Sequence, residues 1–129
     1  DFFLHRVLEF LNSEPMLEFI RQLTGIPEII KADGQATLYQ GDCFLHRHED
    51  VHSNQGWRAA YVMNFTKDWF ASWGGFLQFY DENFNVEEAL IPTFNAINVF
   101  TVPKFHSVSY VPQFCNGARL SITGWFRDK

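Results

Sequence analysis

Hydrophobic residues follow a helical spacing only in the first part of the chain. Within residues 2–11 the apolar side chains recur three and four positions apart, which places them on one face of a helix. A second stretch with this spacing begins after Ser13, a residue type that caps helix amino ends, carries Pro15 in its first turn and ends at Gly25. The pattern predicts two amphipathic helices within residues 1–27.

After these helices the pattern changes to short β-rich segments separated by glycine, proline and other turn residues. Residues 29–32 and 35–39 flank Asp33 and Gly34, a pair that suits a tight turn, so we expect a β-hairpin. Further strands are expected at 43–48, 57–65, 76–80, 95–101, 105–110 and 119–126. Short strands without helices between them favour an antiparallel, mainly β fold. We predict a jelly roll over residues 28–129 with the helix pair packed on it.

The composition is that of a globular chain and excludes several classes of protein. With 129 residues, 47% of them hydrophobic and 18% aromatic, the chain has ample material for the core of a single domain, residues 1–129. The net charge is −5 and no run of lysine and arginine occurs, which argues against nucleic acid as a partner. No apolar run approaches the roughly 18 residues of a membrane span, and Glu9 interrupts the apolar residues that a signal peptide would need.

The cysteines give an expectation about the cellular compartment. The chain has 2 cysteines, Cys43 and Cys115, and neither belongs to a CxxC motif. This usage favours reduced thiols in a cytoplasmic protein, although the fold could still pair them. The oligomeric state is not predicted.

The polar stretch 44–52, FLHRHEDVH, is the candidate centre of chemistry. If it is extended, His46, His48, Asp50 and His52 project from one face. Imidazole and carboxylate groups without a thiolate cluster suit iron or manganese better than a structural zinc, and zinc stays open. Alternation alone does not decide which of the four side chains are ligands. The alternative is a solvated polar strand end.

His106 is a candidate for a further ligand from a distant strand. It stands in FHSVSY, where a histidine among apolar neighbours must satisfy its ring nitrogens or bind something. A lone histidine in such a place is more often structural. Together with a His-x-Asp on another strand, however, it can form the face of two histidines and one carboxylate that leaves open positions on iron.

Several blocks of sequence resemble one enzyme family. YQGDCFLHRHED, which begins at Tyr39, resembles the YxxGxxLxxHxD signature of prolyl-hydroxylase-like 2-oxoglutarate and Fe(II)-dependent oxygenases. The similarity continues in unbroken order over residues 36–126, through NFTKDW, GGFLQFY, IPTFNAINVF, FHSV and RLSITGWF. GGFLQFY and RLSITGWF are most similar to the branch of prolyl 3,4-dihydroxylases and bacterial prolyl hydroxylases. The resemblance implies a double-stranded β-helix, the cupin-like form of the jelly roll.

The resemblance also implies a choice among the metal ligands. In the motif FLxxHxD the metal is held by the residues that correspond to His48 and Asp50, and the distal histidine corresponds to His106. His46 and His52 would then lie outside the ligand set.

Arg119 matches the basic residue that holds the distal carboxylate of 2-oxoglutarate in this family. A buried guanidinium is costly when unpaired, but it matches a carboxylate with two parallel hydrogen bonds. Ser121 and Thr123 share its strand face and could donate to the same carboxylate. The alternative is an arginine paired with a structural acid.

Three other residues receive roles from the resemblance. Tyr39 matches a tyrosine that contacts the co-substrate, and a phenol combines an apolar ring with one polar tip. Asn64 stands where relatives often carry a tyrosine, and its amide could still reach a carboxylate. Trp125 could line the substrate pocket. Packing in the core is the alternative for Tyr39 and Trp125.

The implied activity is that of a dioxygenase that uses Fe(II) and 2-oxoglutarate to hydroxylate a C–H bond, with release of succinate and carbon dioxide. Ascorbate would serve as reductant. A prolyl residue in a protein or peptide is the first expectation for the substrate, while free amino acids and small metabolites stay open. The alternatives are a cupin-like metal-binding domain that isomerises or senses a small ligand without oxygen, and a non-catalytic interaction module.

Overall fold

The computed structural model describes residues 2–51 and 53–129 and begins with the two expected helices, α1 (Phe3–Leu11) and α2 (Glu14–Thr24). Gly25 ends α2 in the left-handed conformation, with φ of 71°. Ser13 precedes α2 as predicted, but its hydroxyl donates backward to the carbonyl of Phe10, at 2.6 Å, instead of capping α2. The helix boundaries are confirmed, whereas the expected side-chain cap is wrong.

Strands are the main regular structure in the rest of the described chain. They are β1 (Lys31–Ala32), β2 (Gln35–Tyr39), β3 (Leu45–His48), β4 (Trp57–Asn64), β5 (Leu77–Tyr80), β6 (Val86–Leu90), β7 (Ala96–Thr101), β8 (His106–Val108) and β9 (Arg119–Arg127). Short 3-10 turns occur at Ser53–Gln55 and Ala71–Trp73. Strand β6 was not predicted, because its residues are mostly exposed and include adjacent glutamates, so no hydrophobic alternation marks it.

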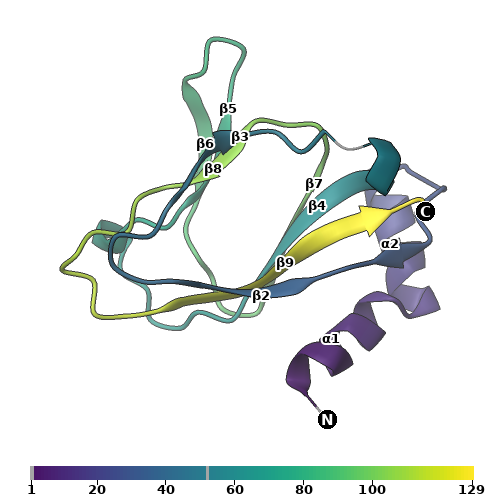
Figure 1. The fold of residues 1–129 in the computed structure, drawn as a ribbon, viewed down its shortest axis with the longest axis horizontal. Helices are drawn as coiled ribbons and strands as arrows, with labels where there is room; N and C mark the ends of the chain where they lie inside the picture. Colours follow the sequence, from purple (N-terminus) through teal and green to yellow (C-terminus); the bar gives the residue numbers. More distant parts are fainter. Residues whose placement is uncertain (1, 52) are drawn as a thin grey trace.

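The strands form two antiparallel sheets, which confirms the predicted jelly roll. In the larger sheet β9 lies between β4 and the edge formed by β1 and β2, and β7 forms the other edge. The smaller sheet has the order β3-β8-β5-β6. Figure 1 shows α1 and α2 on the outer side of the larger sheet and the smaller sheet facing its inner side.

The expected hairpin of residues 29–39 is wrong. Strands β1 and β2 both pair with β9, in one continuous register, and not with each other. The N–H of Asp33 donates to the carbonyl of Trp125 at 3.1 Å, so the chain runs straight on. Gly34 leaves space for Tyr61, because a Cβ there would lie 2.6 Å from the phenol oxygen, which donates to the carbonyl of Asp33. The glycine therefore admits a tyrosine and does not make a turn.

Strand β9 separates the core from the interior between the sheets. Its side chains alternate, so Ile122 and Phe126 face the helices while Arg119 and Ser121 face the smaller sheet. The core between the helices and the larger sheet contains Val7, Leu11, Leu17, Ile20, Ile29, Ala32, Ala59, Tyr61, Ile122 and Phe126. The opposite face of β9 is thus left for polar groups.

Two other expectations concern the cysteines and membranes. Cys43 and Cys115 are both free thiols. Within the described residues, neither helix has the length and the apolar character that crossing a membrane requires.

Replacing Leu11 by alanine tests whether the helices belong to this core. Leu11 is fully buried, so Leu11→Ala should lower the free energy of unfolding by about 2–5 kcal/mol. Leu23→Ala removes the same atoms from a side chain that is 58% exposed, and it should change the free energy of unfolding by at most about 0.5 kcal/mol. Urea denaturation measures both. Equal losses would contradict the packing of α1.

Candidate functional site

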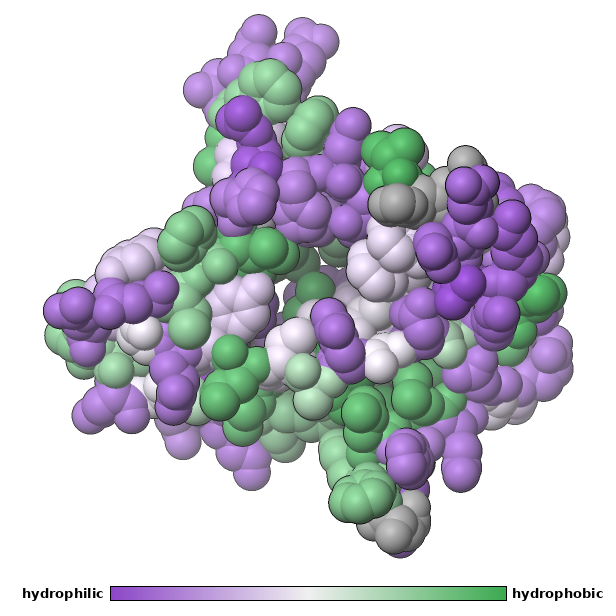
Figure 2. Space-filling model, viewed as in Figure 1, coloured by the Kyte–Doolittle hydropathy of each residue, from purple (hydrophilic) through white to green (hydrophobic). Residues whose placement is uncertain are grey.

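A pocket of about 260 Å³ lies between the two sheets, and Figure 2 shows the molecule hollowed at this place. Many of the residues singled out from the sequence line it: Tyr39, His48, Asp50, His106, Arg119, Thr123 and Trp125. They come from the larger sheet, from the smaller sheet and from the segment that follows β3. Folding therefore gathers into one cavity side chains that are far apart in the sequence.

His48 and His106 lie opposite each other on β3 and β8, with ring centroids 4.2 Å apart. In each ring, Nδ1 lies close to the backbone carbonyl two residues earlier, 2.8 Å from that of His46 and 2.7 Å from that of Lys104. A carbonyl only accepts hydrogen bonds, so both Nδ1 atoms carry a proton, and in the neutral form of each ring the lone pair is therefore on Nε2. Metal-binding histidines are commonly oriented in this way.

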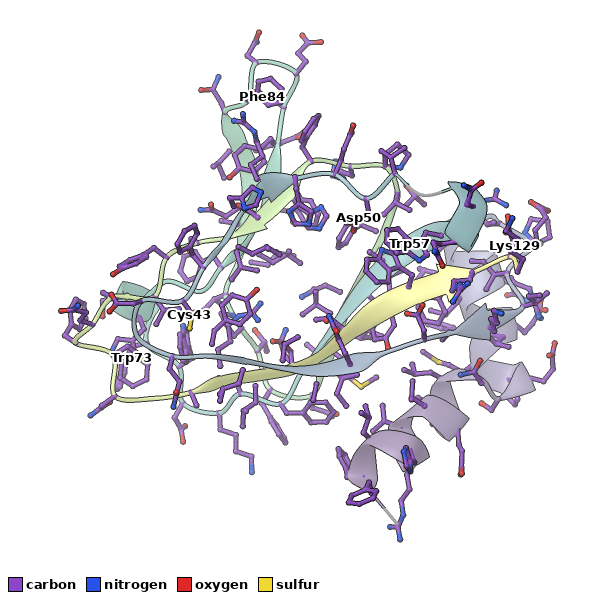
Figure 3. All side chains as sticks on the ribbon, in the orientation of Figure 1. Cys43, Asp50, Trp57, Trp73, Phe84 and Lys129 are labelled. Atoms are coloured by element: carbon purple, nitrogen blue, oxygen red, sulfur yellow. The ribbon has the colours of Figure 1, made fainter. Side chains whose placement is uncertain are left out.

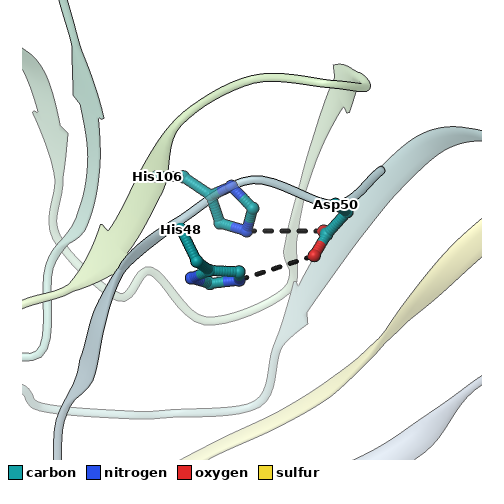
Figure 4. Close-up of side chains that lie close together, drawn as sticks. All are labelled: His48, Asp50 and His106. Carbon is teal, nitrogen blue, oxygen red and sulfur yellow. Dashed lines mark ion pairs between the residues drawn. The ribbon is translucent and has the colours of Figure 1, made fainter. Parts of the chain in front are cut away.

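Asp50 completes a group of three possible ligands. Its Oδ1 is 3.5 Å from Nε2 of His48 and its Oδ2 is 3.6 Å from Nε2 of His106 (Figure 4). These separations exceed a hydrogen bond. Two ligands that are each about 2.1 Å from one cation lie at most about 4.2 Å apart, so the separations suit a shared metal ion. Burial lowers the pKa of His106, which favours the neutral ring that a metal needs.

Among the described residues of the stretch 44–52, the other polar side chains do not join this group. The side chain of His46 is exposed, and its ring centroid lies 6.0 Å from that of His48. His46 contributes its backbone carbonyl instead. His52, the fourth candidate of the same alternation, lies outside the described residues.

Arg119 provides a buried positive charge in the same pocket. It is 2% exposed, its Nε donates to the carbonyl of Gly75 at 2.8 Å, and its Cζ lies 5.2 Å from the ring centroid of Tyr39. Burial lowers the pKa of Arg119. None of the ion pairs among the described residues involves this arginine, so none of the described acids is its structural partner. A buried guanidinium facing a cavity is well suited to a carboxylate.

Ser121 and Asn64 lie behind the pocket wall. The hydroxyl of Ser121 accepts from Nη1 of Arg119 at 3.3 Å and lies 2.6 Å from the hydroxyl of Thr37. Asn64 pairs with Ser121 across the strands and is 2% exposed, and its Oδ1 has no hydrogen-bond partner among the described residues. An unmet buried polar atom is uncommon in folded proteins, so Asn64 is a group that a ligand or water could satisfy.

Thr37, Gly75 and Trp57 are among the residues at the site that were not singled out from the sequence. Thr37 lines the pocket two residues before Tyr39, and strand alternation could have revealed it. Gly75 has φ of +68°, and its carbonyl accepts from Arg119. Trp57 stacks on Trp125 with ring centroids 3.8 Å apart and an angle of 2° between the planes, which nothing in the sequence indicates.

Comparison with known proteins identifies similar sequences and folds. The sequence profile of the 2OG-Fe(II) oxygenase superfamily matches residues 34–127, which include every residue of the pocket. A prolyl-4-hydroxylase from Pseudomonas putida is 24% identical, with a TM-score of 0.72, over 88% of this chain and 60% of that one. An oxidoreductase of the 2OG-Fe(II) oxygenase family from Burkholderia pseudomallei is 16% identical, with a TM-score of 0.77, over 97% of this chain and 56% of that one.

A third solved structure contains a bound peptide. It is a prolyl hydroxylase from Trichoplax adhaerens in complex with a fragment of the hypoxia inducible factor oxygen degradation domain. It is 20% identical, with a TM-score of 0.63, over 91% of this chain and 60% of that one. This chain thus spans less than two thirds of the length of these solved chains.

Single histidine substitutions test the ligand group. His48→Ala should weaken the binding of Mn(II) by at least about 100-fold, because one of three ligands is lost, whereas His46→Ala should leave it within about 3-fold. Titration calorimetry measures both constants, and His46→Ala keeps the backbone carbonyl that orients His48. A similar loss in the two variants would show that the wrong histidine has been chosen.

Proposed function

Because the chain belongs to the 2OG-Fe(II) oxygenase superfamily, we propose that it is a dioxygenase that uses Fe(II) and 2-oxoglutarate to hydroxylate a C–H bond. One observation carries this proposal: a group of possible metal ligands and a buried guanidinium line the same pocket. A 2-oxo acid has an oxo-carboxylate that can bind a metal and a second carboxylate that can bind an arginine. The pocket offers a partner for each end.

At the metal end, His48, Asp50 and His106 would hold Fe(II). A set of two imidazoles and one carboxylate leaves three of six positions free for other ligands. When bound, the iron would supply the dioxygen chemistry that couples conversion of 2-oxoglutarate to succinate and carbon dioxide with hydroxylation of the substrate. The part of the protein is to hold the Nδ1 proton of each ring on a backbone carbonyl, those of His46 and Lys104, so that Nε2 of each neutral ring is turned toward Asp50.

At the carboxylate end, Arg119 would bind the distal carboxylate of 2-oxoglutarate. Its Nε is engaged by Gly75 and its Nη1 by Ser121, so the guanidinium plane is fixed before a ligand arrives. Burial raises the pKa of the Tyr39 phenol, which stays a neutral donor beside this charge. The hydroxyl of Ser121 and the amide of Asn64 would complete the polar end.

We propose a prolyl residue in a peptide or protein as the substrate, with a small molecule as the second choice. The proposal rests on similarity of fold to prolyl hydroxylases, one of them in complex with a peptide, and fold alone says little about substrate. Trp125 lines the pocket, where its ring could contact such a substrate. Ascorbate is proposed as the reductant that keeps the iron in the Fe(II) state.

An anaerobic titration tests the activity. Addition of 2-oxoglutarate to the Fe(II)-loaded chain should give a weak visible charge-transfer band, and admission of air should then release succinate. The His48→Ala variant, treated identically, should give neither signal. If the chain binds another divalent metal but shows neither the band nor succinate, it is a metal-binding domain without oxygenase activity.

Replacing Arg119 separates the two ends of the pocket. Arg119→Lys keeps a charge but loses the paired donors, and Arg119→Gln loses the charge, so 2-oxoglutarate should bind at least about 10-fold and 100-fold more weakly, respectively. Mn(II) binding should stay within about 3-fold in both. Arg127→Gln, a change on the same strand outside the pocket, is the control. Equal losses for metal and co-substrate would contradict the assigned role.

A further inference from the structure

The Asp50 carboxylate receives a hydrogen bond from the opposite sheet. Nε1 of Trp125 donates to Oδ2 of Asp50 at 3.2 Å. We infer that Trp125 is a positioning residue for Asp50 and that Trp57 holds Trp125 in place. This inference rests on the proposed function, because it takes Asp50 as a metal ligand, and it gives Trp125 a role beyond that of a pocket wall.

Asp50 needs such support because its own strand does not provide it. Strand β3 ends at His48, and residues 49–51 have no regular secondary structure. The Asp50 side chain is nevertheless only 12% exposed. The indole N–H is the one hydrogen-bond donor to this carboxylate among the described residues, because the Nε2 atoms of the two facing histidines, at 3.5 and 3.6 Å, are too far away for a hydrogen bond. The orientation of Asp50 is thus set from β9.

The backbone of Trp125 is fixed by two hydrogen bonds to Asp33. Its N–H donates to Oδ1 of Asp33 at 2.9 Å, and its carbonyl accepts from the N–H of Asp33 at 3.1 Å. The neighbouring Gly124 lies so close to the same segment that a Cβ would come within 2.4 Å of the Asp33 carbonyl. The indole therefore starts from a backbone with little freedom to move.

Trp57 fixes the ring itself. Regular alternation along β4 would place Trp57 on the helix side, since Ala60 faces the pocket. An irregularity between Trp57 and Ala59 shifts the register, and the Trp57 ring lies flat on Trp125 instead, at 3.8 Å. Bulges commonly re-aim a side chain next to a site in this way. In Figure 3, Asp50 and Trp57 lie near the same end of the space between the sheets.

The hydrogen bond has a consequence for metal binding. A free carboxylate can bind a cation through one oxygen or through both. With Oδ2 engaged by an N–H donor, Asp50 is held in the orientation that offers one oxygen, which keeps more positions open for other ligands. Trp125 would thereby affect both the affinity for the metal and the number of ligand atoms around it.

The test is a titration with Co(II), a divalent ion with visible absorption bands. Trp125→Phe keeps an aromatic ring and removes the N–H, so Co(II) should bind about 10-fold more weakly and its bands should shift as the carboxylate is released. Trp69→Phe is the matched control, because it loses an indole N–H bond of the same kind, to the carbonyl of Gly74 at 2.8 Å, outside the pocket. It should leave Co(II) binding within about 2-fold.

A second variant keeps the test valid if Trp125→Phe does not fold. Trp57→Leu leaves Nε1 of Trp125 in place as the donor to Asp50 but removes the ring that stacks on Trp125. This variant should weaken Co(II) binding about 3-fold, with a smaller shift of the bands. Unchanged affinity and spectrum in the folded variants, or an equal loss in Trp69→Phe, would overturn the inference. A wild-type chain that bound no Co(II) would instead refute the metal site and with it the proposed function.

Discussion

The pairing of β9 with β4 on one side and with β1 and β2 on the other is the constraint on which this structure depends. A strand in the middle of a sheet exposes alternate side chains to its two faces. In β9 one set fills the core against the helices and the other set, from Arg119 to Trp125, faces the pocket. A slip of one residue would bury the arginine among aliphatic side chains and expose Phe126 to the pocket, so register and site are fixed together.

Two hydrogen bonds from β9 reach the smaller sheet, one at each end of the pocket. Arg119 donates to the carbonyl of Gly75, just before β5, and Trp125 donates to Asp50, just after β3. The two donors are separated by six residues of extended chain, which is roughly 20 Å. Arg119 and Trp125 thus set the distance between the sheets through these polar contacts. The same two residues are proposed to bind the co-substrate and to orient a metal ligand.

Local patterns predicted much of this structure, whereas the error over the hairpin arose from a residue that is distant in the sequence. Helical spacing and Gly25 located both helices, and alternation put Arg119, Ser121 and Thr123 on one face. The Asp33–Gly34 pair was misjudged because the glycine accommodates the phenol of Tyr61, which is distant in the sequence. The local sequence does not distinguish a glycine that makes a turn from a glycine that leaves space for a distant side chain.

In the site, too, local patterns predicted some features, and contacts between distant residues determine the others. Alternation in the stretch 44–52 offered four candidate ligands, and only resemblance favoured His48 and Asp50. The structure supplies a physical reason that is consistent with this choice, since His48 faces His106 across β3 and β8 while His46 is exposed. The bond from Trp125 to Asp50 depends on an irregularity in β4 and on the separation of two sheets, and no sequence pattern encodes either.

The buried charge of Arg119 also explains why such a site requires a rigid frame. A guanidinium taken out of water without an acidic partner destabilises the fold unless other groups satisfy it. Here a backbone carbonyl, a serine hydroxyl and an aromatic ring meet part of that need. The guanidinium donors that these groups do not engage are available to a ligand carboxylate. Binding of a ligand there would join the larger sheet at Arg119 to the metal ligands on the smaller sheet. A ligand that engages both ends would therefore strengthen the contact between the two sheets that form its own pocket.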